Sequence, residues 1–164
     1  MIVVSNTSPL TNLAIIEQFH LLHALYQHIV IPESVWRELN ANGIEWPGSQ
    51  QTRQATWIER MSVANRPLVT VLRCDLDQGE AEAIALALEL HADLLLIDER
   101  EERRVAEQLG LRVTGVVGLL IEAKMQAKLS RIKPLLDRLR YDAGFFISNR
   151  VYSLALHLAQ EDTT

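Results

Sequence analysis

The chain has 164 residues, of which 48% are hydrophobic and 23% are charged, a composition that is typical of one folded domain. The single cysteine, Cys74, excludes an internal disulfide framework and a multi-cysteine zinc site. No apolar run reaches the roughly 20 residues that a bilayer requires, and no signal peptide opens the chain. We therefore expect one cytoplasmic domain, residues 1–164, without a membrane anchor.

The formal net charge of −5 is unevenly distributed along the chain. Residues 75–107 carry 11 acidic and three basic side chains, whereas residues 122–150 carry seven basic and three acidic ones. One part of the chain can therefore gather cations, while the other can contact a polyanion. Two solvated helix faces are the alternative explanation.

Short runs rich in Val, Ile and Leu alternate with longer segments of helical period, which predicts an α/β fold with a mainly parallel sheet. The predicted strands are residues 2–5, 29–31, 68–72, 94–97 and 112–114. The predicted helices are residues 9–19, 19–26, 32–40, 49–61, 77–91, 99–109, 116–128, 133–141 and 148–159. Residues 42–50 contain two glycines and a Trp-Pro pair, and they are predicted to form a surface loop.

Polar residues follow the predicted strands, at the edge of an open parallel sheet where ligands bind. They are Asn6, Thr7 and Ser8 after the first strand, Glu38 in the helix after the second, Asp77, Glu80 and Glu82 at the start of a later helix, and Asp98 and Glu99 after the fourth strand. Carboxylates that are held close together repel one another, and a divalent cation that prefers oxygen ligands relieves this repulsion. Mg²⁺ or Mn²⁺ is the natural candidate.

Helix capping is a competing explanation for several of these residues. Ser8 fits an N-cap that is followed by proline, and Asp77 with Glu80 and Asp98 with Glu101 fit capping boxes. Capping explains a carboxylate at a helix start, but it does not explain why so many carboxylates converge on one sheet edge.

The sequence lacks the residue patterns of a histidine metal site, a phosphate-binding loop and a serine-nucleophile elbow. His20 and His23 share a helix face, but no carboxylate or cysteine stands at ligand spacing from them. Residues 115–118 lack the lysine and the spacing of a phosphate-binding P-loop, and no Gly-x-Ser-x-Gly elbow is present.

The chain resembles the PIN-domain ribonucleases, in particular their VapC-like branch of bacterial toxins. The matching segments are residues 2–10 (IVVSNTSPL), 31–39 (IPESVWREL), 76–85 (LDQGEAEAIA), 94–100 (LLLIDER) and 111–115 (LRVTG), followed by Gly118 and residues 123–124. The resemblance implies a three-layer fold with a small, mainly parallel twisted sheet flanked by helices. It also implies an acidic pocket that holds one or two Mg²⁺ or Mn²⁺ ions.

The resemblance also assigns site residues by position. The four acidic positions of the pocket, catalytic and metal-binding, fall on Asn6, Glu38, Glu80 and Asp98. Accessory positions are Ser8, Thr7, Asp77, Glu82 and Glu99. The candidates for RNA phosphate contacts are Arg100, Arg103, Arg104, Lys124 and Lys128, with Arg131 and Lys133 beside them, and ordinary solvated surface charges are the alternative.

Asn6 departs from the family pattern, which has an aspartate at this position. Asparagine offers a carbonyl oxygen but no charge, so we expect weaker metal binding. The resemblance implies a metal-dependent endoribonuclease, the toxin of a toxin–antitoxin pair, restrained by a small antitoxin protein.

Two alternatives remain at this stage. One is a PIN-fold module, weak or inactive as a catalyst, that binds RNA or a protein partner. The other, a flavodoxin-like phospho-acceptor domain, is disfavoured because asparagine follows the first strand and no lysine follows a late one. The apolar residues Phe145, Phe146 and Ile147 are the only indication of a homodimer.

Overall fold

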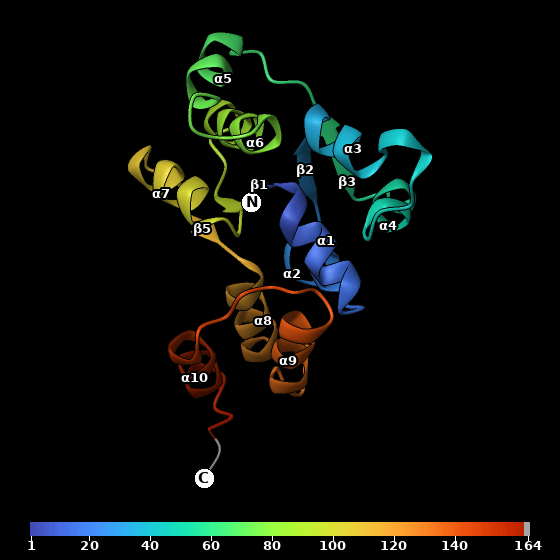
Figure 1. Ribbon diagram of the computed structural model, residues 1–164, viewed down its shortest axis with the longest axis vertical. Helices are drawn as coiled ribbons and strands as arrows, with labels where there is room; N and C mark the ends of the chain where they lie inside the picture. Colours follow the sequence, from blue (N-terminus) through green and yellow to red (C-terminus); the bar gives the residue numbers. More distant parts are fainter. Residues whose placement is uncertain (163–164) are drawn as a thin grey trace.

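A computed structural model describes residues 1–162, and Figure 1 shows its central sheet surrounded by helices. The strands are β1 (Val3–Ser5), β2 (Ile29–Pro32), β3 (Ile58–Met61), β4 (Leu94–Leu96) and β5 (Val113–Thr114). They form one sheet in the order β3-β2-β1-β4-β5, and every pairing in it is parallel. The predicted α/β fold with a small parallel sheet flanked by helices is confirmed.

The helices connect these strands and extend the chain beyond β5. They are α1 (Thr7–Ile15), α2 (His20–Tyr26), α3 (Glu33–Leu39), the 3₁₀ turn η1 (Ala41–Gly43), α4 (Ser49–Gln54), α5 (Arg66–Leu72), α6 (Gln78–Glu89), α7 (Arg100–Gln108), α8 (Val116–Met125), α9 (Lys133–Tyr141) and α10 (Asn149–Leu158). Within residues 1–162, none of these helices has the length and apolar character needed to cross a bilayer.

The central strands are buried on both faces because helices cover the sheet from both sides. Successive residues of β1 alternate between two hydrophobic clusters, since Val3 packs into one and Val4 into the other. In β4, Leu94 and Leu96 join the cluster of Val3, whereas Leu95 joins that of Val4. The first cluster takes its helical side chains from α1, α2, α3, α8, α9 and α10, and the second takes them from α5, α6 and α7.

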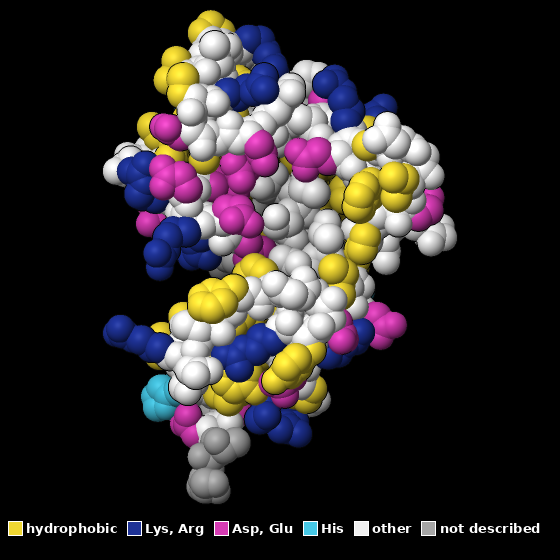
Figure 2. All heavy atoms as spheres, viewed as in Figure 1, with side chains coloured by type: hydrophobic (Ala, Val, Ile, Leu, Met, Phe, Trp, Pro, Cys, Tyr) yellow, Lys and Arg dark blue, Asp and Glu magenta, His cyan; other side chains and the backbone are white. Residues whose placement is uncertain are grey.

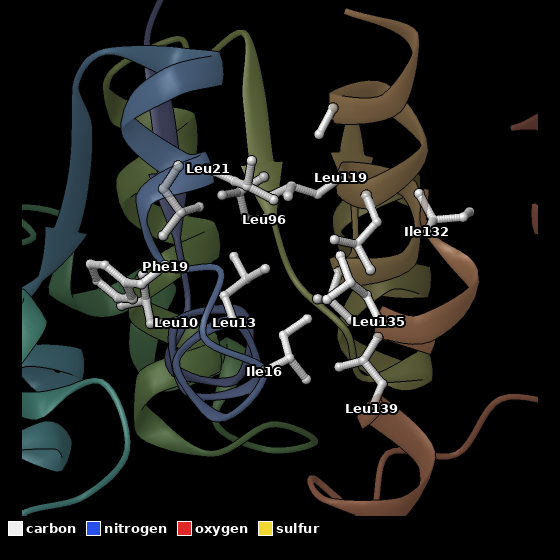
Figure 3. Packing of buried hydrophobic residues seen from close by; sticks show 14 of the residues in the cluster. Leu10, Leu13, Ile16, Phe19, Leu21, Leu96, Leu119, Ile132, Leu135 and Leu139 are labelled. Atoms are coloured by element: carbon white, nitrogen blue, oxygen red, sulfur yellow. The ribbon is translucent and has the colours of Figure 1, made fainter. Parts of the chain in front are cut away.

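In the larger hydrophobic cluster, the C-terminal helices α8 and α9 pack against α1 at the start of the chain. Figure 3 shows Leu13 of α1 and Ile16, the C-cap of α1, facing Leu119 of α8 and Leu135 and Leu139 of α9. Four of these five side chains are fully buried, and Leu135 is 8% exposed. Burying a leucine contributes about 1.5–3 kcal/mol, so this contact holds the C-terminal helices in a defined position beside the sheet.

The strand order creates a crevice at the carboxyl ends of β1 and β4. The chain leaves β1 toward β2 and β3 and then returns to the opposite side of β1 as β4. The backbone N–H of Asn6 donates to the carbonyl of Leu96 at 3.0 Å, so the residues that follow the two strands start side by side. Ligands bind at such reversal points in open parallel sheets.

The predicted strand at residues 68–72 is wrong, because these residues belong to helix α5. Asn65 caps this helix, since its Oδ1 accepts from the N–H of Leu68 at 3.2 Å, and Pro67 lies in the first turn. An N-cap followed by proline is a helix start signal. Here it outweighs the β-branched residues that follow.

The predicted helix at residues 49–61 is also wrong in its second half. Helix α4 ends at Gln54, and the chain then enters β3 at the edge of the sheet. Glu59 and Arg60 of β3 are exposed, so this strand lacks the continuous apolar run of its buried neighbours. Its helix-like composition reflects an edge position, where side chains meet water.

Candidate active site

Five polar side chains from different elements converge at the carboxyl edge of the sheet. Asn6 follows β1, Glu38 lies in α3, Glu80 lies in the first turn of α6, Asp98 follows β4, and Glu102 lies in the first turn of α7. Figure 2 shows acidic side chains gathered in the hollow between the α5–α6 part of the molecule and the α8–α10 part. The structure thus brings together the four residues that the sequence predicts, and it adds Glu102 to them.

Glu38 is positioned by its neighbours on two sides. The hydroxyl of Thr7 donates to Glu38 Oε2, and Gly79 stands so close that a Cβ there would collide with Glu38 Oε1 and lie 3.4 Å from Asn6 Oδ1. Burial raises the pKa of Glu38, the hydrogen bond from Thr7 opposes the shift, and the charge of Asp77 adds to it. The predicted accessory role of Thr7 thus has a structural basis in orienting Glu38.

Asn6 and Glu102 form a buried pair at the bottom of the site. Asn6 is 4% exposed and Glu102 is fully buried. Asn6 Nδ2 donates to Glu102 Oε2 at 3.1 Å, and Glu102 Oε1 has no hydrogen-bond partner among residues 1–162. Burial raises the pKa of Glu102 to about 9, and the charge of Glu80 adds to the shift.

Sequence reasoning missed Glu102. It follows Glu101 in the first turn of a helix, where acidic side chains are common because they stabilise the helix dipole. The only available signal is that Glu102 lies in the acidic segment that follows the fourth predicted strand, four residues after Asp98.

Asp98 is half-buried, and its two carboxylate oxygens differ in their contacts. Its Oδ1 accepts from the N–H of Val116 at 2.8 Å, whereas its buried Oδ2 has no hydrogen-bond partner in the described part of the chain. Burial raises the pKa of Asp98 to about 6, and the hydrogen bond from Val116, the charge of Arg103 and the side chain of Asn12 act against the shift. The predicted capping box of Asp98 with Glu101 is wrong, because Glu99 is the N-cap of α7 and makes no side-chain cap bond. Asp98 instead satisfies the first N–H of α8.

The capping box of Asp77 and Glu80 is confirmed. The N–H of Glu80 donates to Asp77 Oδ1 at 2.8 Å, and the N–H of Asp77 donates to Glu80 Oε2 at 2.9 Å. Burial raises the pKa of Glu80, and its capping bond opposes that effect. Ser8 is not a cap, because α1 begins at Thr7 with Asn6 as its N-cap.

The remaining accessory residues differ in environment. Glu82 is 2% exposed and accepts hydrogen bonds from the N–H of Ser34, from Gln78 and from Arg66. Burial raises its pKa, but these hydrogen bonds outweigh burial and lower it. Glu82 therefore connects α3, α5 and α6. Glu99 is exposed, and its charge contributes to the raised pKa values of Glu80 and Asp98.

The five side chains offer the kind of ligand atoms that a hard divalent cation binds. All five groups offer oxygen ligands, which Mg²⁺ and Mn²⁺ prefer, and the partnerless atoms Asp98 Oδ2 and Glu102 Oε1 are buried acceptors. As the side chains of residues 1–162 are placed, no group of three or more His, Cys, Asp and Glu residues is arranged to hold a metal ion. Metal binding by these residues therefore stays a prediction.

The predicted basic residues separate into two groups. Arg100, Arg103 and Arg104 line a groove of about 570 Å³, and Asp98 belongs to the same lining. Lys124 is 22% exposed and binds Glu161, with Nζ and Oε2 2.9 Å apart.

The other predicted basic residues lie outside this groove. Lys128 is beyond the end of α8, because the helix stops at Met125 and Ala127 has a φ of 57°. Lys128 therefore does not continue α8 as the predicted helix at residues 116–128 requires. Arg131 lies 3.8 Å from Glu161, and Lys133 lies 3.4 Å from Asp137.

The apolar segment that indicated a homodimer is mostly internal. Ile147 is 6% exposed and belongs to the core, and Phe145 packs against that core. Phe146 is 85% exposed.

The comparisons with known proteins agree with this architecture. The model of the PIN-domain family DUF3368 matches residues 2–161, and the chain therefore belongs to the PIN-domain family, whose members are in general nucleases. Among solved structures, a PilT N-terminus domain protein from the hyperthermophilic archaeon Sulfolobus solfataricus P2 has the same fold. It matches with a TM-score of 0.57 and 22% identity, over 75% of this chain and 93% of that chain. The comparison with curated proteins found no match.

Proposed function

We propose that this PIN domain is a metal-dependent endoribonuclease that hydrolyses RNA phosphodiester bonds. The observation that carries the proposal is the convergence of Asn6, Glu38, Glu80, Asp98 and Glu102 at one sheet edge. One member of this cluster, Asp98, also lines a groove together with Arg100, Arg103 and Arg104. Such a combination suits a phosphate ester. The arginines would attract the phosphate backbone of RNA, and the ester would lie beside the carboxylate cluster.

Each residue has a defined task under this proposal. Glu38, Glu80 and Asp98 would hold Mg²⁺ or Mn²⁺ with the carbonyl oxygen of Asn6, and the ion would stabilise negative charge on the phosphate. Thr7 keeps the Glu38 carboxylate turned toward the cluster. The N–H of Val116 keeps Asp98 in place while its second oxygen stays available.

Isosteric substitutions separate capping from catalysis. Asp98→Asn and Glu80→Gln keep an acceptor oxygen for their backbone partners but remove the charge that a metal requires. We expect both variants to fold and to lose at least about 100-fold in Mn²⁺-dependent cleavage of a labelled RNA, the scale of a lost charge-stabilising group. Glu59→Gln is the matched control, because Glu59 is exposed on the edge strand β3. Cleavage by Asp98→Asn at the parent rate would remove this residue from the catalytic set.

A module that binds without cleaving is the second candidate function. The observation that favours it is Asn6, which replaces a charged ligand by an amide that is already bound to Glu102. RNA binding with no cleavage at any Mn²⁺ concentration would support this candidate over the nuclease.

We further propose that the protein acts in the cytoplasm as a VapC-like toxin restrained by a small antitoxin protein. This step rests on the sequence resemblance, above all the segments around Asn6 and Glu80. The neighbouring reading frame tests it, because a small adjacent gene is expected whose product forms a stable complex with this chain and stops its cleavage of RNA.

A further inference from the structure

The groove beside the carboxylate cluster has two chemically different walls. Arg100, Arg103 and Arg104 of α7 line one wall, whereas Phe145, Phe146 and Val151 line the other. Figure 2 shows basic side chains over α7 and an exposed hydrophobic patch over the loop between α9 and α10. Cationic and aromatic groups thus line the same groove as Asp98.

The loop holds the ring of Phe146 outward. Its neighbours Phe145 and Ile147 pack into the core, and Arg140 Nη2 donates to the carbonyl of Ile147 at 2.7 Å. Ser148 caps α10 by accepting from the N–H of Val151 at 3.1 Å. An exposed phenylalanine on an anchored loop adds nothing to the core, and it presents a flat aromatic surface to the groove.

The arginine wall keeps charge available for a ligand. Arg104 is paired with Glu101, with Nε and Oε2 3.1 Å apart, but Arg100 and Arg103 form no salt bridge within residues 1–162. Glu107 is the only acidic residue besides Asp98 on the described lining. A ligand with negative charge and a flat apolar part therefore matches both walls.

We propose that this groove is a nucleotide subsite, in which the base of an unpaired RNA nucleotide stacks on Phe146 and its phosphate contacts Arg100 and Arg103. The inference rests on the proposed nuclease function, and it adds a residue that selects the conformation of the substrate. Only an unstacked base can present its face to an aromatic ring. RNA fits better than an apolar protein segment, because the groove includes Asp98 of the carboxylate cluster and is lined by Arg100 and Arg103, which form no salt bridge within residues 1–162.

Substitutions at Phe146 test the stacking. We expect Phe146→Ala to weaken binding of a fluorescent single-stranded oligoribonucleotide, measured with EDTA, by roughly 5- to 150-fold, the range for one stacked base. Phe146→Leu keeps the apolar surface without the ring and should lose nearly as much. Phe146→Trp should bind like the parent, and the fluorescence of the new indole should be quenched by the oligonucleotide. Tyr141→Ala is the matched control, because Tyr141 is 82% exposed but does not line the groove.

The outcomes are distinguishable. Equal binding by the parent and Phe146→Ala would overturn the subsite, and so would full retention by Phe146→Leu or an equal loss of affinity for duplex RNA. Reduced self-association of Phe146→Ala with unchanged RNA binding would identify the loop as a protein interface and overturn it too. Phe146-dependent binding without Mn²⁺-dependent cleavage would leave the subsite standing and reject the nuclease. Cleavage by the parent and Phe146→Ala at the same rate and affinity would reject the subsite alone.

Discussion

The buried pair of Asn6 and Glu102 controls how much negative charge the site holds. Asn6 contributes an uncharged amide, and burial keeps Glu102 protonated at neutral pH because its pKa is raised to about 9. Three further carboxyl groups, those of Glu38, Glu80 and Asp98, also have raised pKa values. In the metal-free site these carboxyl groups therefore resist ionisation. A bound cation would favour their ionised form.

The substitution Asn6→Asp tests this account of the charge. It removes the amide group that donates to Glu102 and adds a carboxylate to a repulsive cluster, so we expect the metal-free protein to lose about 1–3 kcal/mol of stability. Mn²⁺ should bind more tightly and restore the loss, because a ligand stabilises the state that binds it. Thermal unfolding with and without Mn²⁺ and calorimetric titration measure both effects. Asn42→Asp, in the exposed turn η1, is the control. Equal Mn²⁺ affinity for the parent and Asn6→Asp would exclude Asn6 from the metal site.

The raised pKa of Glu102 predicts a pH-dependent stability. Between the unfolded pKa, near 4.5, and about 9, the folded protein binds more protons than the unfolded chain, so stability falls as pH rises. For one group the slope reaches at most about 1.4 kcal/mol per pH unit. We expect Glu102→Gln to remove most of this slope and to be more stable than the parent at about pH 9.

Urea unfolding in EDTA, at about pH 6 and about pH 9, measures the difference. Glu101→Gln is the control, because Arg104 lowers the pKa of the exposed Glu101 and its charge state does not change in this range. A parent protein with equal stability at both pH values would show that Glu102 is ionised in the folded state.

At the scale of elements, the basic C-terminal segment is largely occupied by internal contacts. Lys124 binds Glu161, Lys133 binds Asp137, and Arg138 binds Asp142 and Glu17. The predicted contact of residues 122–150 with a polyanion therefore has few free cations to rely on. The arginines beside the site belong to α7, within the otherwise acidic segment.

Glu161 joins the end of the chain to α8 and α9. Its side chain is 7% exposed and accepts from Lys124 Nζ at 2.9 Å and from the N–H groups of Ile132 and Lys133 at 2.7 and 3.2 Å. We expect Glu161→Gln to lower stability by about 1.5–3 kcal/mol, the value of hydrogen bonds to a charged group. Burial raises the pKa of Glu161, but the hydrogen bonds outweigh it and lower the pKa. This contribution is therefore present at neutral pH and lost as pH falls below about 4.5.

Chemical denaturation at neutral and acidic pH checks this contribution. Asp142→Asn is the matched control, because the Asp142 side chain is 51% exposed and its ion pair with Arg138 is expected to contribute little. Equal stability of the parent and Glu161→Gln at neutral pH would show that the contact of Glu161 is not stabilising.

At the scale of the whole molecule, the fold brings carboxyl groups of like charge close enough to repel one another. The hollow in Figure 2 lies between the α5–α6 part and the α8–α10 part. The polar side chains of the site come from segments separated by up to 96 residues, as Asn6 and Glu102 are. The two hydrophobic clusters on opposite faces of the sheet supply the stability that opposes this repulsion.

The parallel sheet, its polar edge and most helices are predictable from the amino-acid order, because apolar periodicity and residues at strand ends are local signals. The convergence of Asn6, Glu38, Glu80 and Asp98 follows from the rule that carboxyl ends of parallel strands share an edge. Residues 58–61 and 68–72 show where local signals fail, because edge position and capping decided their structure. The metal and RNA contacts of these residues remain predictions.

Only the tertiary structure shows the burial of Glu102, the outward ring of Phe146 and the internal pairing of Lys124. Each depends on which face of a helix or loop is turned toward a distant segment. Glu101 and Glu102 are adjacent and identical, yet one is exposed and the other fully buried beside Asn6. That difference arises from the packing of α7 against the sheet, which brings together residues far apart in the chain and which no local pattern encodes.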